Sequence, residues 1–115
     1  MTLHLFAGLR VSDHDAAADW YTRLLGHDVA TFRPNDRETV WTLGEHSHVY
    51  IEADPDRAGG GVVTLFVDDL DAALATASAG GLEPSRRETY DDGVRKAVFI
   101  DPDGNEIGMG GAPAS

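Results

Sequence analysis

The stretch LRVSDHDAA at residues 9–17 recurs as LFVDDLDAA at residues 65–73, with six of the nine residues identical and an offset of 56 positions. Each copy passes from alternating apolar residues through an aspartate to an alanine-rich segment. This order is typical of a strand followed by a helix whose first turn the aspartate caps. Half of a 115-residue chain is too short to bury a stable core alone. The repeat therefore predicts two similar modules that share one core.

The apolar pattern extends both copies into complete modules, at residues 1–56 and 57–115 of a single domain. In the first module, helical spacing predicts a helix at residues 14–25, which Gly26 ends, and alternation predicts strands at residues 3–11, 29–33, 39–43 and 48–52. In the second, Asp69 begins a helix that runs to residue 79, and strands are expected at residues 62–67, 82–88, 94–100 and 106–109. A Pro- and Gly-rich linker at residues 54–61 joins the modules. Each module reads β-α-β-β-β, so we expect an α+β fold.

The composition limits the classes of function. The net charge of −11 disfavours nucleic acid and favours a cationic ligand. The chain has no cysteine, which excludes disulfides and leaves His, Asp and Glu as the side chains able to bind a metal. No segment is long and apolar enough to span a membrane, and the first residues lack the pattern of a signal peptide. We expect a cytoplasmic location.

Two phrases carry a resemblance to a known family. The first is WYTRLLG at residues 20–26, and the second is IDPDGNEI at residues 100–107, which contains a tight turn. Together with the paired modules, they resemble the vicinal oxygen chelate superfamily, which contains glyoxalases, extradiol dioxygenases and bleomycin-resistance proteins. The resemblance covers nearly the whole chain. It implies two curved mixed sheets around a shared cavity and a homodimer, in which strands are often exchanged.

The resemblance also locates the four positions at which metal-dependent members place their ligands. In this sequence they fall at Phe6, Glu52, Val62 and Gly108. The repeat offset of 56 relates Phe6 to Val62 and Glu52 to Gly108. Only Glu52 can coordinate a metal, and one carboxylate does not make a site of the usual three or four ligands. We therefore expect no metal and no other cofactor.

Histidines leave one alternative open. His46 and His48 are two residues apart on a predicted strand, and His4 precedes Phe6 by one pleat. A site rearranged onto His4, His48 and Glu52 would require these side chains to converge within about 2 Å of one ion. His14 and His27, at the two ends of the first helix, are expected to be solvated.

The cavity wall is expected to be aromatic with a few charged groups. Alternation along the strands places Phe6, Tyr50, Glu52 and Phe66 on the inner face. Trp41 is ambiguous, because both faces of its strand are apolar. The full set of candidate ligand-binding residues is Phe6, Arg10, Trp41, His48, Tyr50, Glu52, Phe66 and Arg95.

Three functions are compatible with a cavity wall of this composition. The first is a metal-free binding protein that resembles the bleomycin-resistance branch and sequesters an aromatic or cationic small molecule, with antibiotics among the candidates. The second is a metal-independent lyase, isomerase or cyclase in which Glu52 or His48 acts as acid or base and Arg10 or Arg95 holds an oxyanion. A metal enzyme with shifted ligands is the third reading. In each case we expect a homodimer, with its strands exchanged or in place.

Overall fold

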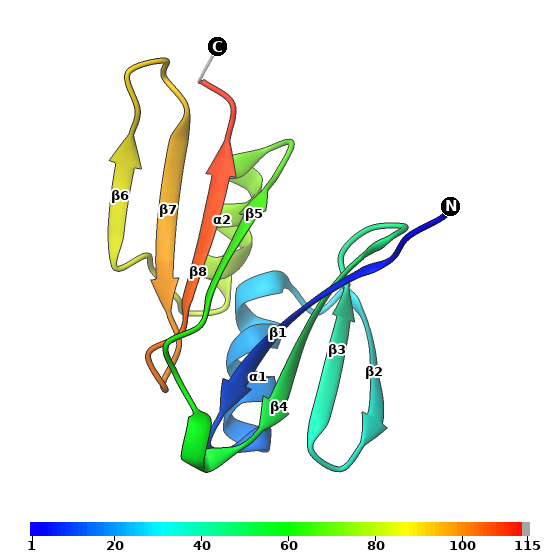
Figure 1. Cartoon of the computed structure of the whole chain (residues 1–115). Coiled ribbons are helices and arrows are strands. Elements are labelled where there is room, and N and C mark those ends of the chain that lie inside the picture. The colour runs from blue at the N-terminus through cyan, green and yellow to red at the C-terminus, as the bar shows by residue number, and fades with distance from the viewer. Residues whose placement is uncertain (114–115) are drawn as a thin grey trace.

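The computed structural model describes residues 1–113 and contains two helices and two four-stranded sheets (Figure 1). In the first module β1 pairs in parallel with β4, and the strand order is β1-β4-β3-β2. Its elements are β1 (Leu5–Val11), α1 (His14–Leu25), β2 (Ala30–Asn35), β3 (Glu38–Thr42) and β4 (Ser47–Ala53).

The second module repeats this topology, with the strand order β5-β8-β7-β6 and a parallel β5–β8 pair. A short 3-10 helix, η1 (Pro55–Arg57), lies in the linker. The elements that follow are β5 (Val62–Phe66), α2 (Leu70–Ala79), β6 (Arg86–Thr89), β7 (Arg95–Ile100) and β8 (Glu106–Gly111). The two β-α-β-β-β units and the α+β class are confirmed.

Some predicted boundaries differ from the observed ones. β2 extends through Pro34 to Asn35, and its pairing with β3 shifts register between Phe32 and Asn35. A proline is tolerated there because β2 is an edge strand, and the backbone groups along its outer edge have no neighbouring strand to pair with. β6 begins at Arg86 rather than residue 82, and β1 begins at Leu5 rather than residue 3.

The repeated aspartates cap both helices, as the motif predicts. The Asp13 carboxylate accepts a hydrogen bond from the Ala16 amide at 3.1 Å, and Asp69 accepts one from the Ala72 amide at 3.0 Å. Each carboxylate thereby satisfies a backbone donor that the first turn of a helix leaves without a partner.

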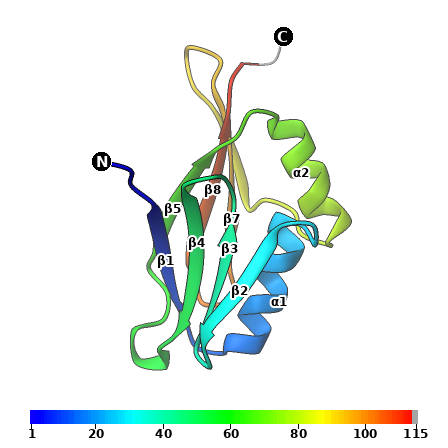
Figure 2. The ribbon, with the colours of Figure 1, turned by 90° about the vertical axis from the view of Figure 1, so that its right-hand side faces the viewer.

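The two modules share one apolar core between the helices and the sheets. Trp20, Tyr21 and Leu24 of α1 belong to the same buried cluster as Phe99 and Met109 of the second module. The helices contact each other and lie on one side of both sheets, whereas the described chain places no element over the other side (Figure 2).

The predicted tight turn between β7 and β8 fastens the second module to the first. Asn105 is fully buried; its Nδ2 donates to the Arg10 carbonyl at 2.8 Å, and its Oδ1 accepts from the Gly61 amide at 2.8 Å. Asp101, also buried, accepts from the Tyr21 hydroxyl at 2.7 Å. Burial, followed by this hydrogen bond, raises the pKa of the Tyr21 hydroxyl. The turn therefore positions β1 against the start of β5.

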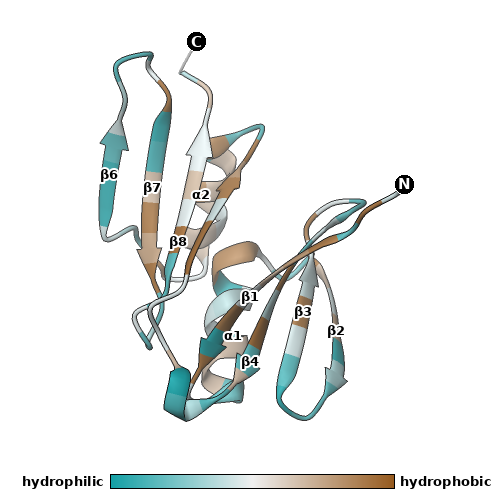
Figure 3. Cartoon of the chain, viewed as in Figure 1, coloured by the Kyte–Doolittle hydropathy of each residue, from teal (hydrophilic) through white to brown (hydrophobic). Residues whose placement is uncertain are grey.

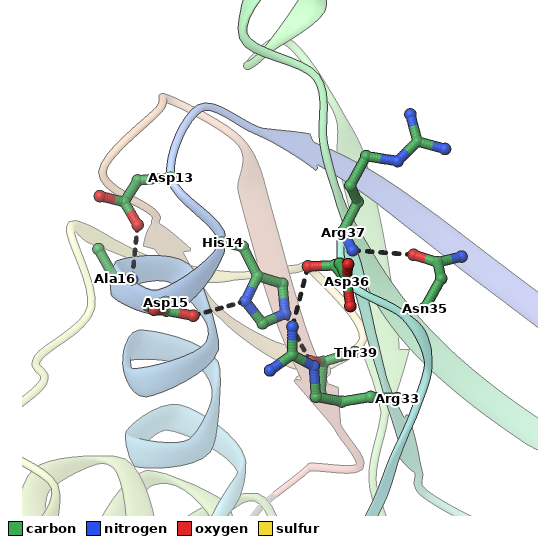
Figure 4. A network of polar contacts seen from close by, with 9 residues as sticks. All are labelled: Asp13, His14, Asp15, Ala16, Arg33, Asn35, Asp36, Arg37 and Thr39. Carbon is green, nitrogen blue, oxygen red and sulfur yellow. Dashed lines mark hydrogen bonds and ion pairs between the residues drawn. The ribbon is translucent and has the colours of Figure 1, made fainter.

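His14 connects α1 to the β2–β3 hairpin (Figure 4). Its Nε2 lies 2.7 Å from Thr39 Oγ1, and its Nδ1 lies 2.8 Å from Asp15 Oδ1. The His14 side chain is only 11% exposed, so the expectation that it is solvated is wrong. The hydrogen bond to His14 and its charge hold the pKa of Asp15 below the ordinary value.

Candidate functional site

The sheet side that faces away from the helices carries most of the residues assigned to the cavity, and we call it the open face. Because side chains alternate along a strand, the residues next to the buried Leu9, Val11 and Ile51 project from this side. The open face includes Phe6, Gly8, Arg10, Phe32, His48, Tyr50 and Glu52 in the first sheet, and Val62, Thr64, Phe66, Arg86, Glu88, Lys96, Ile100, Glu106, Gly108 and Gly110 in the second.

An aromatic stack occupies one end of the first sheet. The rings of Phe6 and His48, which are cross-strand partners, lie parallel with centroids 4.2 Å apart. His48 is held from two sides, because its Nδ1 lies 3.1 Å from Thr42 Oγ1 and its Nε2 lies 3.2 Å from His4 Nδ1. Phe6 is 46% exposed, so the stack presents a flat, fixed aromatic surface.

Tyr50 extends this surface across β1. A Cβ atom built on Gly8, its cross-strand partner, would lie 2.4 Å from the Tyr50 ring carbon Cζ. The ring therefore lies over the glycine, and any side chain at position 8 would displace it. The sequence analysis did not identify this role of Gly8, although a glycine within a strand often marks such a close approach.

Arg10 and Glu52 form the charged part of the first sheet's open face. Arg10 Nε lies 3.5 Å from Glu52 Oε1 and 3.5 Å from Asp54 Oδ2. The Arg10 side chain is 48% exposed and that of Glu52 is 30% exposed, so solvent screens the pair. Glu52 is thus a partly exposed carboxylate with a basic partner.

The second sheet contributes Phe66 at the position that corresponds to Arg10 in the repeat. Phe66 is 67% exposed, and its ring carbon Cδ2 lies 3.2 Å from a Cβ atom built on Gly110. The ring consequently covers a glycine of β8, as the Tyr50 ring covers Gly8. Apolar positions along β1 and β5 are visible in Figure 3.

An apolar cleft of about 540 Å³ lies between the two modules, which is within the usual range for small-molecule sites. His48, Thr64 and Phe66 of the open face line it, so the aromatic surface is continuous with the cleft. The deeper lining comes from both sheets and both helices, and includes Leu5, Ala7, Leu24, Leu25, Val49, Val63, Leu65, Ala73, Thr76 and Met109.

Two residues expected in the cavity wall lie on the opposite side of their sheets. Trp41 is fully buried, with its ring 5.6 Å from that of Tyr21, because its cross-strand partner Val49 belongs to the helix-facing side. Arg95 Nη1 forms an ion pair with Asp71 of α2 at 3.0 Å. The expectation that Trp41 and Arg95 line the cavity is therefore wrong.

The residues at the four family metal positions do not fit a metal. Positions 6, 52, 62 and 108 all lie on the open face, but of Phe6, Glu52, Val62 and Gly108 only the glutamate has a side chain that can coordinate an ion. Nor do the histidines rebuild a site with Glu52, which lies four residues along β4 from His48, about 13 Å at the rise of a strand. Within residues 1–113, no group of three His, Asp or Glu side chains is placed to hold a metal.

The contacts of His14 resemble a nucleophile–base–acid chain, with Thr39, His14 and Asp15 in sequence. Thr39, however, is only 7% exposed, and neither the inter-module cleft nor the small hollow beside Arg95 is lined by Thr39 or His14. A substrate has no route to the hydroxyl through these cavities. The chain of hydrogen bonds is structural.

The two β-α-β-β-β modules, with a cleft between them, define the class of fold. The sequence profile of the Glyoxalase/Bleomycin resistance protein/Dioxygenase superfamily matches residues 2–109. The chain belongs to this superfamily. No helix within the described residues has the length and apolar character needed to cross a membrane.

Solved structures extend this result. A glyoxalase/bleomycin resistance protein from Catenulispora acidiphila DSM 44928 is 47% identical over 97% of this chain and 100% of its own, with a TM-score of 0.92. A bleomycin-binding protein complexed with bleomycin is 21% identical over 96% and 98%, with a TM-score of 0.75. Lactoylglutathione lyase from Agrobacterium tumefaciens is 16% identical over 96% and 94%, with a TM-score of 0.75. No curated protein matches the sequence.

Proposed function

We propose that this protein is a metal-free binding protein that sequesters a flat aromatic or cationic small molecule without altering it. The observation that carries the proposal is the aromatic surface of the open face, formed by Phe6, His48, Tyr50 and Phe66 beside an apolar cleft. Flat rings stack on such side chains, and cationic ligands are attracted to the faces of the rings.

Two further observations support binding rather than metal chemistry. Three of the four family metal positions hold residues that cannot coordinate an ion. A structural neighbour of this chain is a bleomycin-binding protein in complex with bleomycin, which makes antibiotics reasonable first candidates for the ligand. A cytoplasmic location stays a prediction from the sequence.

We also propose that the functional unit is a homodimer, with strands in place or exchanged. The open face exposes large apolar side chains that a second copy would cover, namely Phe6, Phe32, Val62, Phe66 and Ile100. Extended apolar patches of this kind are uncommon on monomers and mark binding surfaces. β5 and β1 are moreover edge strands, whose free backbone groups favour pairing.

Elemental analysis combined with a thermal-shift screen tests the proposal. We expect less than stoichiometric metal in the purified protein. We also expect a raised melting temperature with a flat ligand, since a ligand at 100 times its Kd stabilises the folded state by about 2.7 kcal/mol. One tightly held metal per chain whose removal abolishes function, or a ligand recovered chemically altered, would contradict the proposal.

A further inference from the structure

Lys96 is the only lysine of the chain, and it lies on the open face of the second sheet. It is half-buried at the start of β7, next to Gly110 of β8 on one side and Glu88 of β6 on the other. Its position thus lies within the same sheet face as Phe66.

The lysine side chain crosses β8 over a glycine. A Cβ atom built on Gly108 would lie 2.6 Å from Lys96 Cε and 3.5 Å from Lys96 Nζ. Thr64 Oγ1, from the neighbouring strand β5, lies 3.4 Å from the same point. The missing side chain at position 108 leaves a trough in which the aliphatic stem of the lysine rests, with the ammonium and the Thr64 hydroxyl both close to that glycine. Thr64 also lines the inter-module cleft.

The ammonium has no ion-pair partner within residues 1–113, in contrast to the other cation of this sheet face. Arg86 pairs with Glu106 at 2.8 Å and with Glu88 at 3.3 Å. Glu88 also accepts a hydrogen bond from the Tyr90 hydroxyl at 3.0 Å. Glu88, the cross-strand partner of Lys96, and Glu106 on β8 are therefore engaged by Arg86 and Tyr90, and Lys96 retains its capacity to bind an anion.

The acidic surroundings of Lys96 determine how an anion can bind near it. The chain carries 20 acidic and 9 basic side chains, so its overall field repels anions, and an anion bound at the open face must be held by a local cation. Gly108 is also one of the four family metal positions. The lysine therefore supplies a positive charge at a position where this chain cannot hold a metal.

We propose that Lys96 is the anion-binding group of the open face, and that it selects flat aromatic ligands that carry a carboxylate or a comparable oxyanion. The inference rests on the proposed function. Of the flat aromatic or cationic ligands named there, it selects the aromatic ones that carry an acidic group. Thr64 contributes a hydroxyl that can donate to the same oxyanion.

Three matched probes test this inference by calorimetric titration: 2-naphthoate, 2-naphthamide and 2-naphthylmethylammonium. A charge-assisted hydrogen bond to Lys96 should make naphthoate bind about tenfold tighter than naphthamide. Lys96→Met keeps an unbranched apolar stem but removes the ammonium, and should abolish this preference while leaving the affinity for naphthamide within about twofold. Arg57→Gln, which makes the same change in net charge on the linker helix η1, should retain the preference.

Gly108→Ala is a second variant that keeps the lysine but displaces it from the trough. Its new methyl group meets only the flexible end of Lys96 within 3.0 Å, so the fold should be retained, and the naphthoate preference should fall. A preference that persists in Lys96→Met, or that is absent from the unaltered protein while naphthamide still binds, overturns the role of Lys96 and leaves the proposed function standing.

A direct readout of the lysine separates the two proposals further. Reductive methylation with ¹³C-formaldehyde labels one lysine side chain, whose resonance is assigned by its loss in Lys96→Met. Naphthoate should shift this resonance saturably, and naphthamide should not. If none of the naphthalene probes binds, the proposed function fails. The role of Lys96 is then tested by titrating acetate: a saturable shift of the lysine resonance supports an anion site, and a shift that does not saturate overturns it.

Discussion

At the scale of single residues, ligand binding depends on which aromatic side chains face outward. Tyr50 and Phe66 each lie against a glycine on the open face, where they can stack with a ligand. Trp41 lies in the core and contacts Tyr21. Aromatic residues in these two environments should respond to truncation in opposite ways.

We therefore expect Tyr50→Ala and Phe66→Ala each to weaken the binding of 2-naphthamide by about 1–3 kcal/mol, because each loses a stacking surface and buried area. Their melting temperatures should change little. Trp41→Ala should instead destabilise the fold by about 3–5 kcal/mol, as other large-to-small changes in cores do. Calorimetric affinities and denaturant unfolding measure both. Unchanged affinity in the first two variants would place the ligand elsewhere.

A substitution at Glu52 distinguishes a binding protein from an enzyme. Glu52 is partly solvated and paired with Arg10. Glu52→Gln should therefore weaken the binding of 2-naphthylmethylammonium by about two- to fivefold, the range for exposed ion pairs, and leave the affinity for naphthamide unchanged. In an enzyme that uses Glu52 as acid or base, the same variant would bind its substrate normally and lose turnover. Affinity and product formation measured on one preparation distinguish these outcomes.

At the scale of elements, alternation along the strands predicted the open face well where only one side of a strand is apolar. β1 and β4 are of this kind, and Phe6, His48, Tyr50 and Glu52 were assigned to the correct side. β3 is apolar on both sides, because Val40 and Trp41 are both buried, and alternation then cannot decide which one faces the helix.

Other parts of the site depend on contacts that a single sequence does not reveal. Gly8 and Gly108 look like weak points of their strands, and only their neighbours across the sheet show that they admit Tyr50 and Lys96. Arg95 lies on the helix-facing side of β7, the side of Ala97 and Phe99, and there it pairs with Asp71, which is 24 residues away. The repeated helix caps, by contrast, rest on local backbone geometry and were predicted correctly.

The β7–β8 turn provides a test of how the elements are joined. Asn105→Ala removes hydrogen bonds to the Arg10 carbonyl and the Gly61 amide and leaves both without that partner, so we expect a loss of about 2–4 kcal/mol in the free energy of unfolding. Asn35→Ala at the exposed end of β2 is the matched control, and should cost less than about 1 kcal/mol. Equal losses in the two variants would show that the turn does not hold the modules together.

At the scale of the whole molecule, the sheets are covered by helices on one side only (Figure 2). The exposed apolar residues of the other side lead us to expect a dimer, with a mass in light scattering of about twice 12.3 kDa at micromolar concentration. Phe32→Lys and Ile100→Lys place charges on this side away from the aromatic stack, and should shift the mass toward the monomer. A monomeric mass for the unaltered protein would contradict the dimer.

The central claim is that a flat small molecule binds on the open face beside the inter-module cleft. The most direct measurement is a ¹H–¹⁵N NMR titration of the isotopically labelled protein with 2-naphthamide, with the amide resonances assigned. We predict saturable shifts that cluster at Phe6, His48, Tyr50 and Phe66, with the helix-facing strand positions of β3 and β7 little affected. Shifts centred on α1 and α2, or no saturable shift at any residue, would contradict the account.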